Sequence, residues 1–386
     1  MTASHDSGRR LRVLMVMPSY YPVVGGMEIQ IARQIPYLRE HGIDAAILTR
    51  RPAGSPDFER HEGVAIRRIS VPGGPGLRSI SFTALGTLDI VKHRHEIDLI
   101  HAHSIMSPTT IAALSGTLLR KPRLVTLHQS YEPEHLLGKP FGKQRLDLFR
   151  RIIPRFISIS SDIEQLLLAH DVPAARIVSI PNGIDTTTFK PAPVTERTEL
   201  RRQLHLPEGV PIAVFVGRLQ PVKQVDVLLE AWSSLTSGRL VILGDGDQRA
   251  SLEAQATRLN LTDRVEFRGM VPNAVDFLRA ADIFVLPSAS EGLSVALLEA
   301  MASGLVPIAT AIGGTTDLIR DGQTGLLVQS SDVAGLNAAL CHALADADWR
   351  REVSEAARTF VVANYDMRVI TAQLAGVYRD VVDATG

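Results

Sequence analysis

The sequence predicts an α/β protein made of two Rossmann-like, doubly wound domains that face a cleft. The chain has 386 residues, which is too long for one ordinary hydrophobic core. Short β-branched runs alternate with amphipathic helical stretches along it, a pattern typical of βαβ units. A polar, proline-containing segment separates two such series, which indicates two domains joined by a linker.

The first series contains near-continuous apolar runs, as expected of parallel strands buried on both faces. Helical stretches lie between them, for example Glu28–Arg39 and Thr109–Leu119. The expected strands are Leu11–Met17, Ala45–Thr49, Ile97–Ala102, Arg123–Leu127 and Phe156–Ser160.

The second series begins at Ile212, and the segment Lys190–Thr198 before it is the expected linker. We therefore expect domains at 1–190 and 191–365, followed by a terminal helical segment, 366–386. The pattern leaves open whether this last segment packs on the second domain or crosses back to the first. The expected strands are Ile212–Val216, Leu240–Leu243, Arg264–Phe267, Ile283–Leu286, Val306–Ala309 and Gly325–Val328.

The formal net charge is zero, but the two halves differ. Residues 1–190 hold 24 Lys+Arg against 17 Asp+Glu, and residues 191–386 hold 17 against 24. A basic half favours an anionic partner such as phosphate, nucleic acid or a membrane surface. A solvated surface with uneven charge explains the same numbers, and both interpretations stay open.

Cysteine content and apolar runs exclude several other classes. The single cysteine, Cys341, excludes a disulfide framework and a cysteine-based zinc site, and its apolar helical context predicts a buried thiol. The apolar run near the N-terminus is interrupted by Arg12 and ends at Pro18, so it fits a strand better than a signal peptide. No run approaches the ~18 apolar residues of a membrane span, so we expect a cytoplasmic protein.

The first strand is followed by a loop that ends in Gly25 and Gly26, and a helix comes next. Glycines let the backbone approach a phosphate or sugar closely, and a helix N-terminus offers free N–H groups. A plain strand-to-helix turn would look the same. The spacing matches neither the dinucleotide fingerprint nor the P-loop, which disfavours a nicotinamide dehydrogenase.

Arg218 and Lys223 follow the first strand of the second domain. An arginine grips phosphate oxygens with two hydrogen bonds and a lysine adds a point charge, so the two can neutralise a diphosphate without a metal. The alternative is an exposed basic turn; the position after a strand favours the functional interpretation.

Two glutamates, Glu291 and Glu299, come after the strand Ile283–Leu286. We expect Glu291 to open a helix, which would place Glu299, eight residues later, within roughly 80° on the same face. Glu299 is surrounded by apolar residues, and a carboxylate there needs partners such as sugar hydroxyls. Glu291 is equally suited to cap the helix. The N–H groups expected to point at a bound anion belong to Gly292, Leu293 and Ser294.

An ordered set of motifs over nearly the whole chain resembles the retaining glycosyltransferases of the GT-B fold, specifically glycosyltransferase family 4. Each motif alone is unspecific, but their order is specific. They are Gly25-Gly26, Pro181-Asn182-Gly183-Ile184-Asp185, Gly217-Arg218 with Lys223, Gly244-Asp245-Gly246, Phe267-Arg268-Gly269-Met270-Val271, Leu286-Pro287-Ser288 and Glu291 with Glu299.

The resemblance implies a role for each matching residue in donor binding. Glu291 corresponds to the glutamate that contacts the donor sugar, and Glu299 to the one that binds the ribose. Arg218 and Lys223 correspond to the diphosphate clamp, and the loop Gly292–Ser294 adds backbone N–H groups.

Further matches concern the glycine loop, the base and the acceptor side. Gly26, with Gly25, resembles the loop near the β-phosphate and the sugar, and the backbone at Met270 and Val271 is expected to receive the base. His128, after a strand of the first domain, resembles the family histidine near donor sugar and acceptor. Of His101 and His103, which alternation points the same way, we prefer His103 for the acceptor side.

The resemblance implies a retaining, metal-independent hexosyltransferase that uses a nucleotide diphosphate sugar and no cofactor, with a lipid-linked, saccharide or small-molecule acceptor and no nucleic acid partner. Departures at Gln224, Leu293, Ser294 and Asp317 leave the donor sugar open. Two alternatives stay open: a sugar-nucleotide epimerase of the same architecture and a non-catalytic sugar-nucleotide-binding protein.

The segment Lys139–Phe156 carries six basic residues and one acidic residue, Asp147, interleaved with aromatic and aliphatic side chains. Such a composition suits the headgroup region of an anionic membrane. We therefore expect peripheral association with the inner face of the membrane. The alternative is that Leu148, Ile152 and Phe156 are core residues and the charges are a solvated face.

Overall fold

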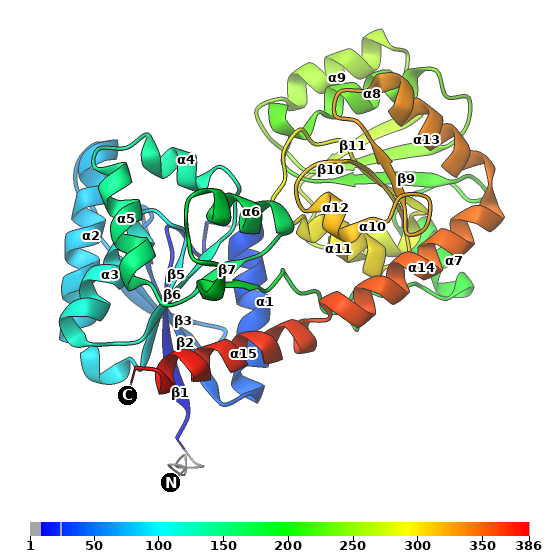
Figure 1. Ribbon diagram of the computed structural model, residues 1–386. Coiled ribbons are helices and arrows are strands. Elements are labelled where there is room, and N and C mark those ends of the chain that lie inside the picture. The colour runs from blue at the N-terminus through cyan, green and yellow to red at the C-terminus, as the bar shows by residue number, and fades with distance from the viewer. Residues whose placement is uncertain (1–8, 24, 386) are drawn as a thin grey trace. The chain divides into compact units, whose positions relative to one another are not determined.

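The computed structural model describes residues 9–23 and 25–385 (Figure 1). The chain forms two compact units. Unit 1 comprises the residues up to Asn182 together with those from Arg368 onward, and unit 2 comprises Gly183–Met367. The family fold expected from the motifs is thus built as two α/β units, each with its own sheet and core.

The division lies before the boundary expected at residue 190. Residues 184–189 belong to unit 2 because their backbone is bonded to it: Ile184 N donates to Tyr365 O at 2.8 Å, and Arg358 donates to Phe189 O at 3.1 Å. The expected linker Lys190–Thr198 is also shorter than predicted, because a helix already begins at Val194.

The described part of unit 1 has an eight-stranded sheet in the order β3-β4-β2-β1-β5-β6-β7-β8. All neighbours are parallel except β3 and β4, a hairpin that the sequence pattern did not predict. The strands are β1 (Leu11–Val16), β2 (Ile43–Arg50), β3 (Phe58–His61), β4 (Val64–Ile69), β5 (Leu99–His103), β6 (Arg123–Leu127), β7 (Phe156–Ser158) and β8 (Ile177–Ser179).

Helices cover both faces of this sheet, as a doubly wound unit requires. Figure 1 shows α1 on one side and α2, α3 and α5 on the other. The helices of unit 1 are α1 (Gly26–Glu40), α2 (Pro75–Lys92), α3 (Ser107–Leu119), α4 (Glu132–Leu137), α5 (Gly142–Ile152), α6 (Ser161–Ala169) and α15 (Met367–Asp383).

The last helix, α15, packs on unit 1, so the chain ends in the unit in which it began (Figure 1). Its apolar residues are buried in one core with side chains of α1 and β1, among them Ile35 and Met15. The buried residues of α15 recur at helical spacing and are Ile370, Leu374, Ala375, Tyr378 and Val381.

The described part of unit 2 has a six-stranded parallel sheet in the order β11-β10-β9-β12-β13-β14, the order of a dinucleotide-binding doubly wound sheet. Its strands are β9 (Ile212–Val216), β10 (Arg239–Leu243), β11 (Val265–Gly269), β12 (Ile283–Leu286), β13 (Val306–Thr310) and β14 (Leu326–Val328). Its helices are α7 (Val194–Gln203), α8 (Val225–Ser233), α9 (Arg249–Arg258), α10 (Ala274–Ala280), α11 (Val295–Ala302), α12 (Thr315–Leu318), α13 (Val333–Ala345) and α14 (Ala347–Tyr365).

The structure contradicts the expectation for the single cysteine. The thiol of Cys341 was expected to be buried, but it is exposed, because α13 buries Leu336, Leu340 and Leu344 and turns Cys341 outward. Among the described residues, no helix combines the length and the apolar character needed to cross a membrane.

We expect Leu374→Ala to destabilise the protein by about 2–5 kcal/mol, because it removes buried methyl groups between α15 and the sheet and leaves a cavity. Val369→Ala is the matched control, since Val369 is on the same helix but is 41% exposed. Urea unfolding followed by circular dichroism measures both changes. Equal effects of the two substitutions would contradict the docking of α15 through this face.

Candidate functional site

In unit 2, the loops that follow β9 and β12 meet through an ion pair. Lys223 Nζ lies 2.5 Å from Glu291 Oε1, and Ser288 Oγ donates to the same oxygen at 2.7 Å. Both charged side chains are largely shielded from solvent, with 21% and 11% of their areas exposed. The structure thus brings together two residues that the sequence proposed for the donor site, separated by 68 positions.

Backbone hydrogen bonds hold these two loops against each other. Ala289 N donates to Val222 O at 2.7 Å, which ties the loop after β12 to the 3-10 turn Pro221–Lys223. Thr310 Oγ1, from the end of β13, donates to Ser288 O at 2.5 Å. The ion pair is therefore built on a rigid base rather than on two free loops.

Arg218 lies just after β9 and has a different environment from Lys223. Its side chain is exposed and forms no ion pair or hydrogen bond with any described residue. The loop that carries it packs against Gly244 and Gly246. A Cβ at Gly244 would lie 1.8 Å from Gly217 O, and one at Gly246 would lie 2.3 Å from Leu219 O. Only glycine permits this approach, which explains the Gly-Asp-Gly motif.

The helix expected to start at Glu291 starts four residues later. Ser294 is the N-cap of α11, and its Oγ accepts from Leu297 N at 3.3 Å. Gly292 remains outside the helix because its carbonyl oxygen accepts from Gly314 N at 2.8 Å. The prediction that Glu291 caps this helix, and the helical geometry derived for Glu291 and Glu299, are therefore wrong. The N–H groups of Gly292, Leu293 and Ser294 precede the helix.

Glu299 and the expected base-binding backbone lie elsewhere in unit 2. Glu299 is buried on α11, with 8% of its surface exposed. Met270 and Val271 follow the end of β11, and the Met270 side chain is exposed. Met270 and Val271 thus follow the carboxyl end of a parallel strand, and Glu299 is on the helix that comes after β12. The other candidates of unit 2 have the same kind of position.

In unit 1, Gly25 and Gly26 lie where the loop after β1 enters α1, and Gly25 is the N-cap. Sequence analysis missed the neighbouring Glu28. Its side chain is buried in the first turn of α1, where it accepts from Ser19 Oγ at 2.6 Å, and a Cβ at Gly25 would lie 2.8 Å from its Oε2. The glycine therefore leaves space for this carboxylate.

His103 and His128 come together at the ends of β5 and β6. His103 Nδ1 lies 3.1 Å from His128 Nε2, and the two rings are stacked. The His101 ring lies against that of His103, tilted by 37° with ring centroids 4.0 Å apart, so alternation correctly placed them on one face. His101 is held between two hydroxyls at 2.7 Å, those of Thr126 and of Tyr378 on α15.

Burial keeps these imidazoles neutral. It lowers the pKa of His101 to about 3 and that of His128 to about 4, and the pKa of His103 falls well below its ordinary value. His103 Nε2 is buried without a hydrogen-bond partner among the described residues, and it borders a cavity of about 30 Å³ with both polar and apolar lining residues, which is large enough to hold water.

Glu132, which sequence analysis also missed, connects the loops that follow β5 and β6. Its two carboxylate oxygens accept from Ile105 N at 2.8 Å and from His128 N at 3.1 Å. Burial raises the pKa of Glu132, although these backbone hydrogen bonds oppose the rise. No local signal marked it, because a glutamate on a short helix is ordinarily exposed.

A metal site would need at least three ligating side chains close together in the part of the chain that the structure describes. That part contains no group of three or more His, Cys, Asp or Glu side chains placed to hold a metal ion.

We expect the free energy of unfolding to fall as the pH is lowered from about 6.5 to about 5. The three buried histidines stay neutral in the folded state, whereas the unfolded chain takes up protons in this range, so protonation favours unfolding. Each such histidine contributes up to about 1.4 kcal/mol per pH unit. Urea unfolding at several pH values measures the slope, and His128→Gln should reduce it. An unchanged slope in this variant would contradict a neutral, buried His128.

Two family models match this chain. Residues 24–188 match the model of Glycosyltransferase Family 4, and residues 196–360 match that of Glycosyl transferases group 1. The two matches cover unit 1 and unit 2 in turn, and together they span most of the chain.

Individual relatives agree with these matches. The chain is 27% identical to a D-inositol 3-phosphate glycosyltransferase of Thermobispora bispora, over 93% of this chain and 90% of that protein. It is 30% identical to the protein of that name from Nocardia farcinica, over 85% and 79%. The solved structure of Anabaena Alr3699/HepE in complex with UDP has a TM-score of 0.81, 22% identity, and coverage of 96% and 100%. The chain therefore belongs to glycosyltransferase family 4, has the GT-B fold, and is a glycosyltransferase.

Proposed function

We propose that this enzyme transfers a hexose-type sugar from a nucleotide diphosphate to an acceptor hydroxyl, retains the anomeric configuration and needs no metal. The observation that carries the proposal is the cationic loop of unit 2, with exposed Arg218 and with Lys223 held by Glu291. HepE, which has the same fold, has been solved with UDP-glucose. This supports a nucleotide sugar as the first donor class to test.

In the proposed reaction, the bond from the anomeric carbon to the β-phosphate oxygen breaks, and a bond from the same carbon to the acceptor oxygen forms on the same face. The acceptor proton passes to the departing phosphate. Arg218 and Lys223 stabilise the charge that develops on the diphosphate, which is the main catalytic contribution we assign to the protein. The alternative is a sugar-nucleotide epimerase, which would need no acceptor.

The buried histidines take different roles in this proposal. His128 is the group of unit 1 that we assign to the donor sugar and acceptor. His103 is almost fully buried and hydrogen-bonded to it, which favours a positioning role over direct contact. Glu132 is a second positioning residue, since it accepts from the His128 backbone.

The acceptor class is part of the proposal. The relatives named above are D-inositol 3-phosphate glycosyltransferases, so a phosphorylated polyol is the first small-molecule acceptor to test, beside saccharides and lipid-linked sugars. A thermal-shift panel of UDP-, GDP- and ADP-sugars identifies the donor, because a ligand of the native state raises the melting temperature. NMR of the product then reads its anomeric configuration. Inversion would refute retention, and a free epimer formed without acceptor would favour the epimerase.

We expect Arg218→Ala and Lys223→Ala each to lower kcat by about 10²–10³-fold, because each removes a charge that stabilises the leaving diphosphate. Arg202→Ala is the matched control, since Arg202 is an exposed arginine of the same unit whose side chain pairs with neighbouring Glu199. Steady-state kinetics with and without EDTA measures both claims. Near-normal turnover in both site variants, or activity lost to EDTA and restored by Mg²⁺ or Mn²⁺, would refute the assignment.

Glu299→Gln should weaken the binding of the bare nucleoside diphosphate, because we assign Glu299 to the ribose. Glu291→Gln should weaken the binding of the nucleotide sugar more than the binding of the bare nucleoside diphosphate, because we assign Glu291 to the sugar. Calorimetry with both ligands and both variants decides. The reverse pattern would exchange the two roles.

We also propose reversible binding of unit 1 to anionic membranes, through a surface that differs from the expected one. In the segment Lys139–Phe156, Phe149 and Phe156 are buried, whereas Phe141 and Leu148 are 74% and 43% exposed. Helix α2, which like α5 packs against α3, adds a larger apolar face, because Leu77, Ile80 and Leu88 are exposed at helical spacing. Such a face beside basic side chains suits a headgroup interface.

Sedimentation with vesicles that contain anionic lipid tests this surface. We expect binding at low salt that weakens at high salt. Each basic residue near the membrane surface should contribute about 1 kcal/mol of binding free energy at low salt. The pair Ile80→Asp and Leu88→Asp should abolish it, whereas Val194→Asp, at an exposed apolar position of unit 2, should not. If the wild-type protein stays in the supernatant at low salt, the membrane proposal is wrong.

A further inference from the structure

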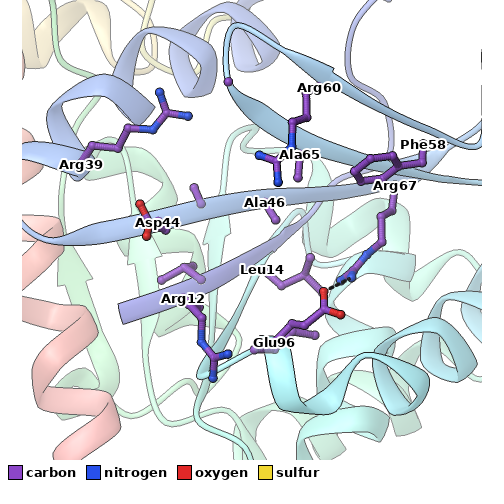
Figure 2. Close-up of a pocket in the computed structure, with 14 residues that line it drawn as sticks. Arg12, Leu14, Arg39, Asp44, Ala46, Phe58, Arg60, Ala65, Arg67 and Glu96 are labelled. Carbon is purple, nitrogen blue, oxygen red and sulfur yellow. Dashed lines mark hydrogen bonds and ion pairs between the residues drawn. The ribbon is translucent and has the colours of Figure 1, made fainter. Parts of the chain in front are cut away.

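Unit 1 also has a surface hollow at the amino ends of its strands, opposite the ends that carry the residues discussed above. A hollow of about 560 Å³ opens on the sheet face near the starts of β1, β2 and β4 (Figure 2). The residues discussed above follow the carboxyl ends of the strands, so none of them borders this hollow. It is accordingly a separate place on the molecule.

Strand register explains why the sheet is hollow here. Leu14, Ala46 and Ala65 are neighbours across β1, β2 and β4, and Arg60 of β3 is paired with Ala65. Two alanines in one cross-strand row leave a shallow trough with an apolar floor. Larger side chains come from the rows on either side, among them Arg67. Figure 2 shows the small residues in the middle and the charged ones around them.

The carboxylates at this hollow already have cationic partners. Glu96 and Asp44, both of which line it, are paired, and so is Asp98, the partner of lining residue Arg12. The pairs are Arg67–Glu96 at 3.3 Å, Arg10–Asp44 at 2.9 Å and Arg12–Asp98 at 2.7 Å.

Two guanidinium groups of the hollow have no such partner. Arg39 and Arg60 form no side-chain hydrogen bond or ion pair with any residue that the structure describes. Arg39 extends from the last turn of α1 over the backbone of Gly63, where an added Cβ would lie 3.2 Å from its terminal nitrogen. The hollow therefore combines an apolar floor with two uncompensated positive charges, and Phe58 is exposed at its rim.

We propose that this hollow binds a small organic anion, with its phosphate or carboxylate between Arg39 and Arg60 and its apolar part over Ala46 and Ala65. Guanidinium groups bind such oxyanions with paired hydrogen bonds. The floor offers no hydrogen bonds, which favours an apolar body over a sugar. The same chemistry is offered by a free phosphate monoester and by the headgroup of a phosphomonoester lipid, so the test includes both.

Calorimetry on the full chain compares inorganic phosphate with phenyl phosphate. We expect phenyl phosphate to bind more tightly, because its ring adds apolar burial over the alanine row. The double variant Arg39→Gln/Arg60→Gln should weaken it by about tenfold or more, since two charge-assisted contacts are lost. Arg202→Gln/Arg258→Gln, which removes two exposed arginines of unit 2, is the matched control and should leave binding unchanged.

Two further measurements distinguish a lipid from a free anion, and the hollow of unit 1 from the donor site of unit 2. Binding to vesicles that contain phosphatidic acid is measured with the same variants. The source of the anion is a lipid if Arg39→Gln/Arg60→Gln weakens binding to these vesicles but not binding of phenyl phosphate. Lys223→Ala should leave phenyl phosphate binding intact, because Lys223 belongs to the donor site of unit 2. The proposal is overturned if neither probe binds the wild-type protein, if the control variant weakens binding equally, or if Lys223→Ala abolishes it.

Discussion

Parallel strand direction is the constraint on which the rest of this structure depends. Because the strands of unit 2 run the same way, every loop that follows a strand emerges at one edge of the sheet. That edge collects Arg218, Lys223, Met270 and Glu291 from segments that are far apart in the sequence. In unit 1 the same rule gathers the loops after β1, β5 and β6, although the β3–β4 hairpin is antiparallel.

The loops at these edges are held by close backbone contacts rather than by their charges. Gly244, Gly246 and Gly314 each lie so near a neighbouring carbonyl oxygen that no side chain fits. The Lys223–Glu291 pair then forms on a fixed base. A partly buried pair of this kind contributes little net stability, because desolvation offsets most of the attraction. It does hold the lysine side chain in place, and in the proposed reaction the donor diphosphate replaces the carboxylate as its partner.

Unit 1 treats its polar groups differently, since it buries them. Three neutral imidazoles lie against one another at the ends of β5 and β6, and the carboxylate of Glu132 is satisfied by backbone N–H groups of two loops. Hydrogen-bonded partners make such a network rigid, because buried polar groups without a partner are costly. His103 Nε2 has no such partner among the described residues. The terminal helix takes part in it through the hydroxyl of Tyr378. Its docking is therefore tied to the placement of His103 and His128, and not only to the stability of the core.

Local pattern alone determined the α/β class and eleven of the fourteen described strands, because apolar runs are signals of a few neighbouring residues. Arg218, Lys223 and Glu291 were also found from local pattern, whereas His128 and Met270 came from the family resemblance. Local pattern missed β3, β4 and β8. It left open where α15 packs, since an amphipathic face fits either core, and only the burial of Ile370, Leu374 and Tyr378 against unit 1 decided it. It was wrong about the start of α11, because Gly292 O accepts from the distant Gly314 N and the helix begins only after the local Ser294 cap. It was also wrong about Cys341, because the packing of α13 turns this residue outward. Glu28, Glu132 and the hollow beside Arg39 had no local signal at all. Their contacts and burial arise only because separate segments of the sequence meet in the folded chain.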